Sequence, residues 1–192
     1  SFPIDILFVR DDDIPSLVNN GDADLAIIGE NELLEKTISK NLLNIKKILK
    51  LGFSKCRLSF AIPENEDYID LNNKKVATSY PNIVDNYFKE NSINASVVDI
   101  HGSVELTPHI GISDCICDLV SSGATLEANN LKEVVTILES EAVLIQNSDL
   151  DSNKLDLANK LINRIKGVIN ARESKYVMLN ADVNNVKNIC SL

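Results

Sequence analysis

Residues 115–129 read Cys115-Ile-Cys-Asp-Leu-Val-Ser-Ser-Gly-Ala-Thr-Leu-Glu-Ala-Asn129. The apolar first half predicts a strand over 115–120, and the hydroxyl-rich turn after it leads into a helix from about Leu126. Such a turn can cradle a phosphate, because glycine lets the backbone approach the anion while hydroxyls and free helix-start amides donate to it. The residues expected to bind are Asp118, Ser121, Ser122, Gly123, Ala124, Thr125 and Leu126.

Two other interpretations of this stretch remain open. Asp118 can hold ribose hydroxyls or a hydrated Mg²⁺ instead of facing a phosphate directly. The whole segment can also be an ordinary strand-to-helix turn with Thr125 as the N-cap, since Ser, Thr and Asp are common caps.

Outward from this stretch, strands alternate with helices over short connections. The pattern predicts helices over 13–19, 32–36 (capped by Asn31), 83–90, 103–110 and 156–170. It predicts further strands over 4–9, 23–28, 45–49, 56–62, 75–78, 95–100, 133–138 and 142–146. This alternation is typical of an α/β fold built on largely parallel sheets.

The polar, proline-marked segment 63–73 suggests a crossing between two lobes, with the strand 142–146 as the return. The expected first lobe comprises 1–63 and 140–170, and the second comprises 64–139. A strand over 174–180 and a helix over 183–189 then predict the start of a further domain over 171–192.

Composition limits the function. The chain has 192 residues, of which 44% are hydrophobic, and a formal charge of -9, so we expect a globular protein that does not bind nucleic acid. A mononucleotide can still bind through Mg²⁺ and local cations. No apolar run is long enough for a membrane span, and no signal peptide is visible. Four cysteines, at 56, 115, 117 and 190, fit reduced thiols in the cytoplasm.

Three basic side chains are candidates for holding anionic substrate groups. Arg10 follows the first predicted strand and can clamp a diphosphate, although the run Asp11 to Asp13 after it is also typical of a solvated helix start. Lys55 and Arg57 share one strand face, opposite Cys56. If that face lines a cleft, the two side chains supply cationic charge to it. If the face is open surface, the pair has little functional significance.

Two weaker candidates are Tyr80, which can stack on an adenine, and Glu105, which can bind a ribose or a metal-bound water. A buried tyrosine and a helix-capping glutamate are the default interpretations. Histidine occurs only at 101 and 109, so a histidine metal cluster is excluded, and Cys115 and Cys117 are expected to be core thiols.

Several segments together resemble the ATP phosphoribosyltransferase family over nearly the whole chain. They are, in order, Arg10-Asp-Asp-Asp-Ile-Pro15, Asp22-Ala-Asp-Leu-Ala-Ile-Ile-Gly-Glu-Asn31, the segment 52–58, Ala77-Thr-Ser-Tyr-Pro81, Gly102-Ser-Val-Glu105 and the segment 118–129. Residues 167–180 are similar to the junction into the regulatory domain of the long, histidine-inhibited form. The resemblance therefore indicates the long form, without its first strand and most of its regulatory domain.

The resemblance implies a two-lobed fold like that of type II periplasmic binding proteins. It implies that N1 of ATP attacks phosphoribosyl pyrophosphate with Mg²⁺, giving N1-(5-phosphoribosyl)-ATP and pyrophosphate. The turn then holds the ribose phosphate, Arg10 contacts the leaving group, Tyr80 neighbours the nucleotide, and Glu105 matches a motif position. Assembly from dimers to hexamers and inhibition by histidine are also implied. We expect activity and regulation of the parent protein rather than of this chain alone.

The alternative from another functional class is a non-catalytic solute-binding or effector-sensing module, because the same two-lobed fold serves both. A plain binder has no need for both a hydroxyl-rich phosphate turn and a basic strand facing it. A catalytically dead regulatory paralogue is disfavoured because Arg10, Asp118 and Thr125 are all present.

Overall fold

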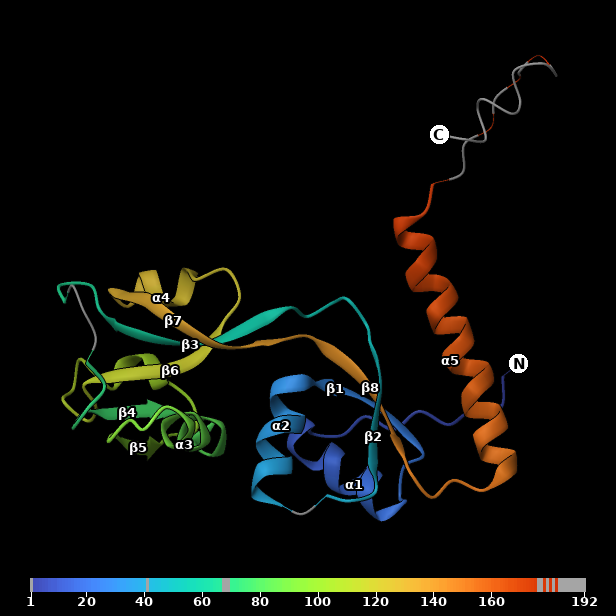
Figure 1. Ribbon diagram of the computed structural model, residues 1–192, viewed down its shortest axis with the longest axis horizontal. Coiled ribbons are helices and arrows are strands. Elements are labelled where there is room, and N and C mark those ends of the chain that lie inside the picture. The colour runs from blue at the N-terminus through green and yellow to red at the C-terminus, as the bar shows by residue number, and fades with distance from the viewer. Residues whose placement is uncertain are drawn as a thin grey trace. The chain divides into compact units, whose positions relative to one another are not determined.

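The computed structural model describes residues 2–40, 42–66 and 70–175, together with 178, 180 and 182. The chain forms two compact units, Ser1–Leu155 and Asp156–Leu192. The first unit contains two β-sheets, and the second contains most of the helix α5 (Ser152–Glu173) (Figure 1). The helix predicted over 156–170 is therefore confirmed. The strand and helix predicted over 174–180 and 183–189 lie almost wholly outside the described residues.

The smaller sheet has three strands in the order β1-β8-β2. These are β1 (Leu25–Gly29), β8 (Ala142–Asn147) and β2 (Ile45–Lys50). A 3-10 turn (Asp11–Asp13) and the helix α1 (Ile14–Asn20) precede it, and α2 (Glu30–Ser39) connects β1 to β2. Val18, Ile28, Val143 and Ile145 form the buried core of this lobe.

The larger sheet has five strands in the order β5-β4-β6-β3-β7. These are β5 (Ser96–Asp99), β4 (Lys75–Thr78), β6 (Cys115–Val120), β3 (Cys56–Pro63) and β7 (Leu131–Ser140). The helices of this lobe are α3 (Pro81–Glu90) and the short α4 (Ala124–Ala128). The strands β4 and β6 have the bounds that the sequence predicted.

The expectation of largely parallel sheets is wrong. Only β4 pairs in parallel, with β5 and with β6, whereas β8 is antiparallel to β1 and β2, and β3 is antiparallel to β6 and β7. The helix-connected strands β1 and β2 do run in the same direction, as a right-handed crossover requires. β8, which returns from the other lobe, is inserted between them in the opposite direction, and β3 enters the larger sheet in the same way.

The crossing between the lobes also lies elsewhere than predicted. β3 already belongs to the larger sheet, so the chain crosses at residues 51–55 and not at 63–73. The return strand runs beside this crossing: Leu51 N donates to Ala142 O (2.9 Å), and Ala142 N donates to Phe53 O (3.0 Å). Gly52 N donates to Glu141 Oε2 (2.8 Å). The lobes are therefore joined by two adjacent, hydrogen-bonded chain segments.

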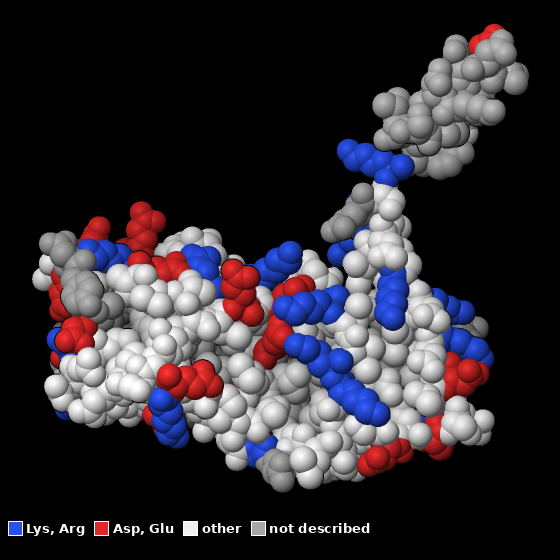
Figure 2. All heavy atoms as spheres, viewed as in Figure 1, with Lys and Arg blue, Asp and Glu red and all other residues white. Residues whose placement is uncertain are grey.

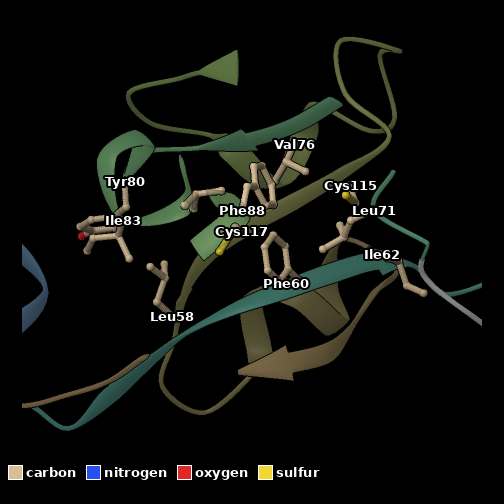
Figure 3. Close-up of a cluster of buried hydrophobic side chains, with 11 residues drawn as sticks. Leu58, Phe60, Ile62, Leu71, Val76, Tyr80, Ile83, Phe88, Cys115 and Cys117 are labelled. Atoms are coloured by element: carbon tan, nitrogen blue, oxygen red, sulfur yellow. The ribbon is translucent and has the colours of Figure 1, made fainter. Parts of the chain in front are cut away.

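The core of the larger lobe is built around β3. Leu58, Phe60 and Ile62 are fully buried in one cluster (Figure 3). Ala61 belongs to a second cluster of buried residues. Phe60 stacks on Phe88 of α3 with ring centroids 6.0 Å apart. Because β3 is paired on both edges and buried on both faces, its register is strongly specified.

Cys115 and Cys117 lie in the first of these clusters, as predicted for core thiols. Burial raises the pKa of the Cys115 thiol to about 12, so it stays protonated and unreactive near neutral pH. Cys56 is also free, whereas Cys190 lies outside the described residues.

Three local predictions are wrong. Residues 4–9 are not a strand, and Ile6, Leu7 and Phe8 are 71%, 71% and 92% exposed, because no described strand pairs with them. Asn31 does not cap α2 but lies within its first turn, after Gly29 at the cap position. The helix predicted over 103–110 is one 3-10 turn, Val104–Leu106, since Ser103 before it is left-handed (φ 53°).

Polar side chains of α2 join the smaller lobe to the start of α3. The Glu35 carboxylate, 5% exposed, accepts from Asn82 N (2.9 Å), Asn82 Nδ2 (2.5 Å) and Ile83 N (2.9 Å). Tyr80 OH donates to Glu32 Oε1 (2.8 Å) and accepts from Asn31 Nδ2 (3.0 Å). We call this set of contacts the α2–α3 clasp.

The clasp predicts that Glu35→Ala destabilises the protein by at least about 2 kcal/mol, because each buried donor left without its acceptor costs about 1–3 kcal/mol. Urea unfolding of the variant measures this. Glu90→Ala is the control, since Glu90 is an exposed glutamate at the C-terminal end of α3, away from the clasp. Equal stability of the two variants would show that Glu35 does not hold α3.

Candidate phosphoribosyl-transfer site

The turn after β6 joins the strand to α4 through exposed serines and a left-handed glycine. Ser121 and Ser122 are exposed, Gly123 is left-handed (φ 86°), and α4 begins at Ala124. Thr125 is the second residue of this helix, and its hydroxyl bonds none of the described residues. The prediction that Thr125 is the N-cap is therefore wrong, because Gly123 occupies that position. Leu126 is buried and packs α4 onto the sheet.

Arg57 connects β3 to this turn. In the register of β3 and β6 it lies opposite Val120, and its Nη1 donates to the Ser121 carbonyl oxygen (3.1 Å). Its Nε donates to Glu133 Oε1 (2.5 Å), and its Nη2 pairs with Glu133 Oε2. This forked hydrogen bonding lowers the pKa of the Glu133 carboxyl to about 2, so Glu133 is ionised at any physiological pH.

A cavity of about 390 Å³ lies beside Arg57 and the crossing segments. Its lining residues are Lys50, Lys55, Cys56, Arg57, Ser121, Glu139, Ser140 and Glu141. Lys50 is held by Glu30 (3.0 Å) and Glu141 (3.7 Å). Lys55 is exposed and makes no ion pair within the described part of the chain. Figure 2 shows Lys and Arg side chains gathered over the region of β2.

Asp118, Glu105 and Tyr80 lie close enough to affect one another electrostatically. Burial raises the pKa of the Asp118 carboxyl, and the Glu105 carboxylate raises it further, while a hydrogen bond from Leu119 N (2.8 Å) opposes the shift. Burial also raises the pKa of Tyr80, as do its hydrogen bond to Glu32 and the charge of Asp118. Tyr80 is 7% exposed, which agrees with the default interpretation of a buried tyrosine.

The structure does not bring Arg10 to the cavity. Its side chain is 83% exposed, and it pairs with Asp12 Oδ1 at 3.4 Å. No described hydrogen bond or ion pair joins it to Lys55, Arg57 or the turn. The role predicted for Arg10 therefore stays a prediction.

A larger cavity of about 600 Å³ lies at the other end of β3. Its lining residues are Pro63, Glu64, Asn65, Glu66, Pro108, His109 and Asn130. Its charged groups include two glutamates and no lysine or arginine, so it suits an anionic substrate less well than the smaller, basic cavity does.

Sequence reasoning missed Glu133 and Glu35. Arg57 faces Glu139 in the register of β3 and β7, and it reaches Glu133 only because two bulges shift that register. No local pattern reveals such a diagonal pair. The sequence contains a weak indication of the role of Glu35. Asn31, Leu34 and Glu35 fall on one face of α2, and two polar residues at inward-facing positions indicate that they have hydrogen-bond partners.

Comparison with known proteins decides the family. The family described as HisG, ATP phosphoribosyltransferase, matches residues 10–167. The chain belongs to the ATP phosphoribosyltransferase family. An ATP phosphoribosyltransferase from Bacteroides thetaiotaomicron is 46% identical over 195 residues, which cover 100% of this chain and 67% of the relative. The chain thus spans about two thirds of the length of that relative.

Solved structures agree with this assignment. The ATP phosphoribosyltransferase (HisG:HisZ) complex from Thermotoga maritima matches with a TM-score of 0.74 at 27% identity, covering 85% of this chain and 78% of that one. A periplasmic sulfonate-binding protein from Methylobacillus flagellatus matches with a TM-score of 0.59 at 14% identity, covering 80% and 51%. The second match concerns the fold alone, and it confirms the predicted two-lobed, periplasmic-binding-protein-like architecture.

These matches confirm the prediction that the chain belongs to the transferase that catalyses the first step of histidine biosynthesis. A non-catalytic solute-binding module, the alternative, shares only the fold with ATP phosphoribosyltransferases. No described helix is long and apolar enough to cross a membrane.

The half-buried Asp118 is predicted to lower the stability of the folded state in exchange for function. Its raised pKa means that the folded state holds the proton more tightly than the unfolded state, so stability is lost as pH rises through the folded pKa. Asp118→Asn keeps an oxygen that can accept from Leu119 N and removes the buried charge. We expect the variant to gain stability over the wild type between pH 4 and pH 7 and to lose activity.

Thermal unfolding across that pH range measures the effect, with Asp85→Asn as the control, since Asp85 is exposed on α3. An Asp118→Asn variant that is less stable than the wild type at every pH would contradict the account.

Proposed function

We propose that the first unit binds ATP and phosphoribosyl pyrophosphate and joins them to give N1-(5-phosphoribosyl)-ATP and pyrophosphate. The observation that supports this most directly is the exposed, hydroxyl-rich turn after β6, bonded through Ser121 to a basic cavity in a chain of this family. Both halves of an activated sugar phosphate thereby find donors at the turn and in the adjoining cavity.

In this proposal the turn holds the 5′-phosphate of the sugar. The hydroxyls of Ser121, Ser122 and Thr125 donate to it, together with main-chain amides at Gly123 and Ala124. Gly123 permits the left-handed bend that turns these groups to the same side. Leu126 anchors the helix start in the core, so the donors are held in place before the substrate arrives.

Lys55 supplies the cation nearest to the pyrophosphate. Most other cations around the cavity are already paired with carboxylates, whereas Lys55 is exposed and unpaired among the described residues. A flexible ammonium group can follow a charge that develops as the leaving group departs. Arg10, as a second leaving-group contact, remains part of the proposal.

The reaction forms a bond between N1 of adenine and the anomeric carbon, and it breaks the bond from that carbon to pyrophosphate. Such a displacement passes through a state with oxocarbenium character. The protein therefore contributes orientation of the two substrates and stabilisation of the departing charge, without a covalent intermediate. Tyr80 and Glu105 are proposed to flank the nucleotide, with Tyr80 placed by the α2–α3 clasp.

The residues present fit a magnesium ion that arrives with the substrate. No group of three or more His, Cys, Asp or Glu side chains suited to a metal occurs in the described residues, so a protein cage is absent there. Asp118 is a partly buried carboxylate next to Glu105, and Mg²⁺ commonly binds one or two carboxylates plus substrate phosphates. When bound, the ion would neutralise charge on the pyrophosphate.

Assembly and regulation are also proposals. The matched relative is longer than this chain, and we propose that the additional length holds a regulatory region through which histidine inhibits. We also propose homo-oligomers from dimers to hexamers. The Thermotoga maritima structure is a HisG:HisZ complex, so a separate second subunit is the alternative. Free thiols at Cys56, Cys115 and Cys117 are in keeping with a cytoplasmic enzyme.

The phosphate turn predicts that Thr125→Val lowers turnover by about 10²-fold to 10³-fold, the effect of losing one preorganised donor. Valine keeps the shape of threonine and removes only the hydroxyl. Thr37→Val is the control, because Thr37 is exposed on α2 and bonds only its own helix. Steady-state assays of the intact parent enzyme with both substrates measure the effect, and a wild-type rate for Thr125→Val would remove the proposed role.

A further inference from the structure

Each of the three nitrogens of the Arg57 guanidinium group binds a protein group, which occupies three of its five N–H donors. Nε and Nη2 bind the two carboxylate oxygens of Glu133, and Nη1 binds the Ser121 carbonyl oxygen. Arg57 is 36% exposed and Glu133 is 24% exposed, so the pair is partly sheltered from water. Protein groups therefore hold the Arg57 side chain in place, and it is not an unpaired cation available for a substrate phosphate.

Glu133 is fixed in turn by neighbouring hydroxyls. Thr136 Oγ1 donates to Glu133 Oε1 (3.2 Å), and Thr136 and Ser59 share a hydrogen bond of 3.0 Å between their hydroxyls. These groups belong to β7, an edge strand of the larger sheet, and to β3, the strand beside it. The position of the Arg57 side chain is thus set by the sheet.

The hydrogen bond from Arg57 to the Ser121 carbonyl oxygen orients a whole peptide unit. The carbonyl of Ser121 and the N–H of Ser122 belong to one planar peptide unit and point in opposite directions. Holding the carbonyl toward Arg57 therefore aims the Ser122 N–H away from Arg57, at the start of the turn. Loss of this hold would let the peptide unit rotate and would spoil the array of donors.

We propose that Glu133 is a positioning residue for phosphoribosyl pyrophosphate, which orients Arg57 so that Arg57 fixes the first peptide of the phosphate turn. This inference rests on the proposed function, because it takes the turn to be the site of the 5′-phosphate. It replaces the expectation that Arg57 touches the substrate directly and leaves Lys55 as the direct cation.

The two alternative roles of Arg57 predict opposite changes in the KM for phosphoribosyl pyrophosphate when Glu133 is replaced by glutamine. If Glu133 positions Arg57, Glu133→Gln weakens the hold on the turn, and the KM for phosphoribosyl pyrophosphate rises by about tenfold or more. If Arg57 is a direct phosphate ligand restrained by Glu133, the same change frees a positive charge and lowers that KM. The KM for ATP stays within about twofold under positioning, because no described hydrogen bond or ion pair joins Arg57 or Glu133 to Tyr80 or Glu105, the residues proposed to flank the nucleotide.

The experiment measures both KM values and calorimetric binding of phosphoribosyl pyrophosphate with Mg²⁺, for the wild type and for Glu133→Gln. Glu127→Gln is the matched control: it removes one exposed negative charge on α4 without touching Arg57. We expect its binding to be equal to or tighter than that of the wild type. Similar weakening in both variants would show a general charge effect and overturn the proposal.

Arg57→Lys provides a second route if Glu133→Gln does not fold, because a lysine keeps the charge but cannot span Glu133 and Ser121 together. It should raise the same KM, and combining it with Glu133→Gln should add little, since both changes break one connection. A fully additive double variant, or an unchanged or lowered KM in Arg57→Lys, contradicts the positioning role. Wild-type protein that fails to bind phosphoribosyl pyrophosphate at all would instead refute the proposed function.

Discussion

The strand β3 is the constraint on which the rest of the structure depends. It is hydrogen-bonded to β6 on one edge and to β7 on the other, and Leu58, Phe60 and Ile62 are fully buried. A slip of one residue would move this apolar set to the opposite face, at a large cost in burial. The register that the core enforces also places Arg57 opposite Val120, next to Ser121, the first residue of the turn after β6.

Electrostatics of the site follow from local pairing and not from net charge. The chain carries a formal charge of -9, yet it gathers cations where the lobes are joined. Carboxylates offset most of them: Glu30 pairs with Lys47 and Lys50, and Glu133 pairs with Arg57. These pairs fix the positions of side chains. Lys55 remains unpaired among the described residues and can meet an incoming polyphosphate.

Sequence reasoning succeeded where a pattern is local. The strands β4 and β6 were predicted with their observed bounds because short apolar runs end at clear turn residues. The antiparallel insertion of β8 was not predictable, since it depends on where a distant segment returns. The segment 4–9 has the apolar composition of a strand, but composition cannot supply the neighbouring strand that it needs.

The same division applies to the site. The turn from Ser121 to Leu126 was found because its chemistry is continuous in the sequence, whereas Glu133 was missed because its bond to Arg57 runs diagonally across two bulges. The central claim is that this turn binds the phosphate of an activated ribose. An NMR titration of ¹⁵N-labelled protein with phosphoribosyl pyrophosphate and Mg²⁺ tests it most directly. The account predicts that the amides of Ser122, Gly123, Ala124 and Thr125 shift most and saturate together. Shifts confined to the amides of Glu64, Asn65, Glu66, His109 and Asn130, around the larger cavity, would contradict it.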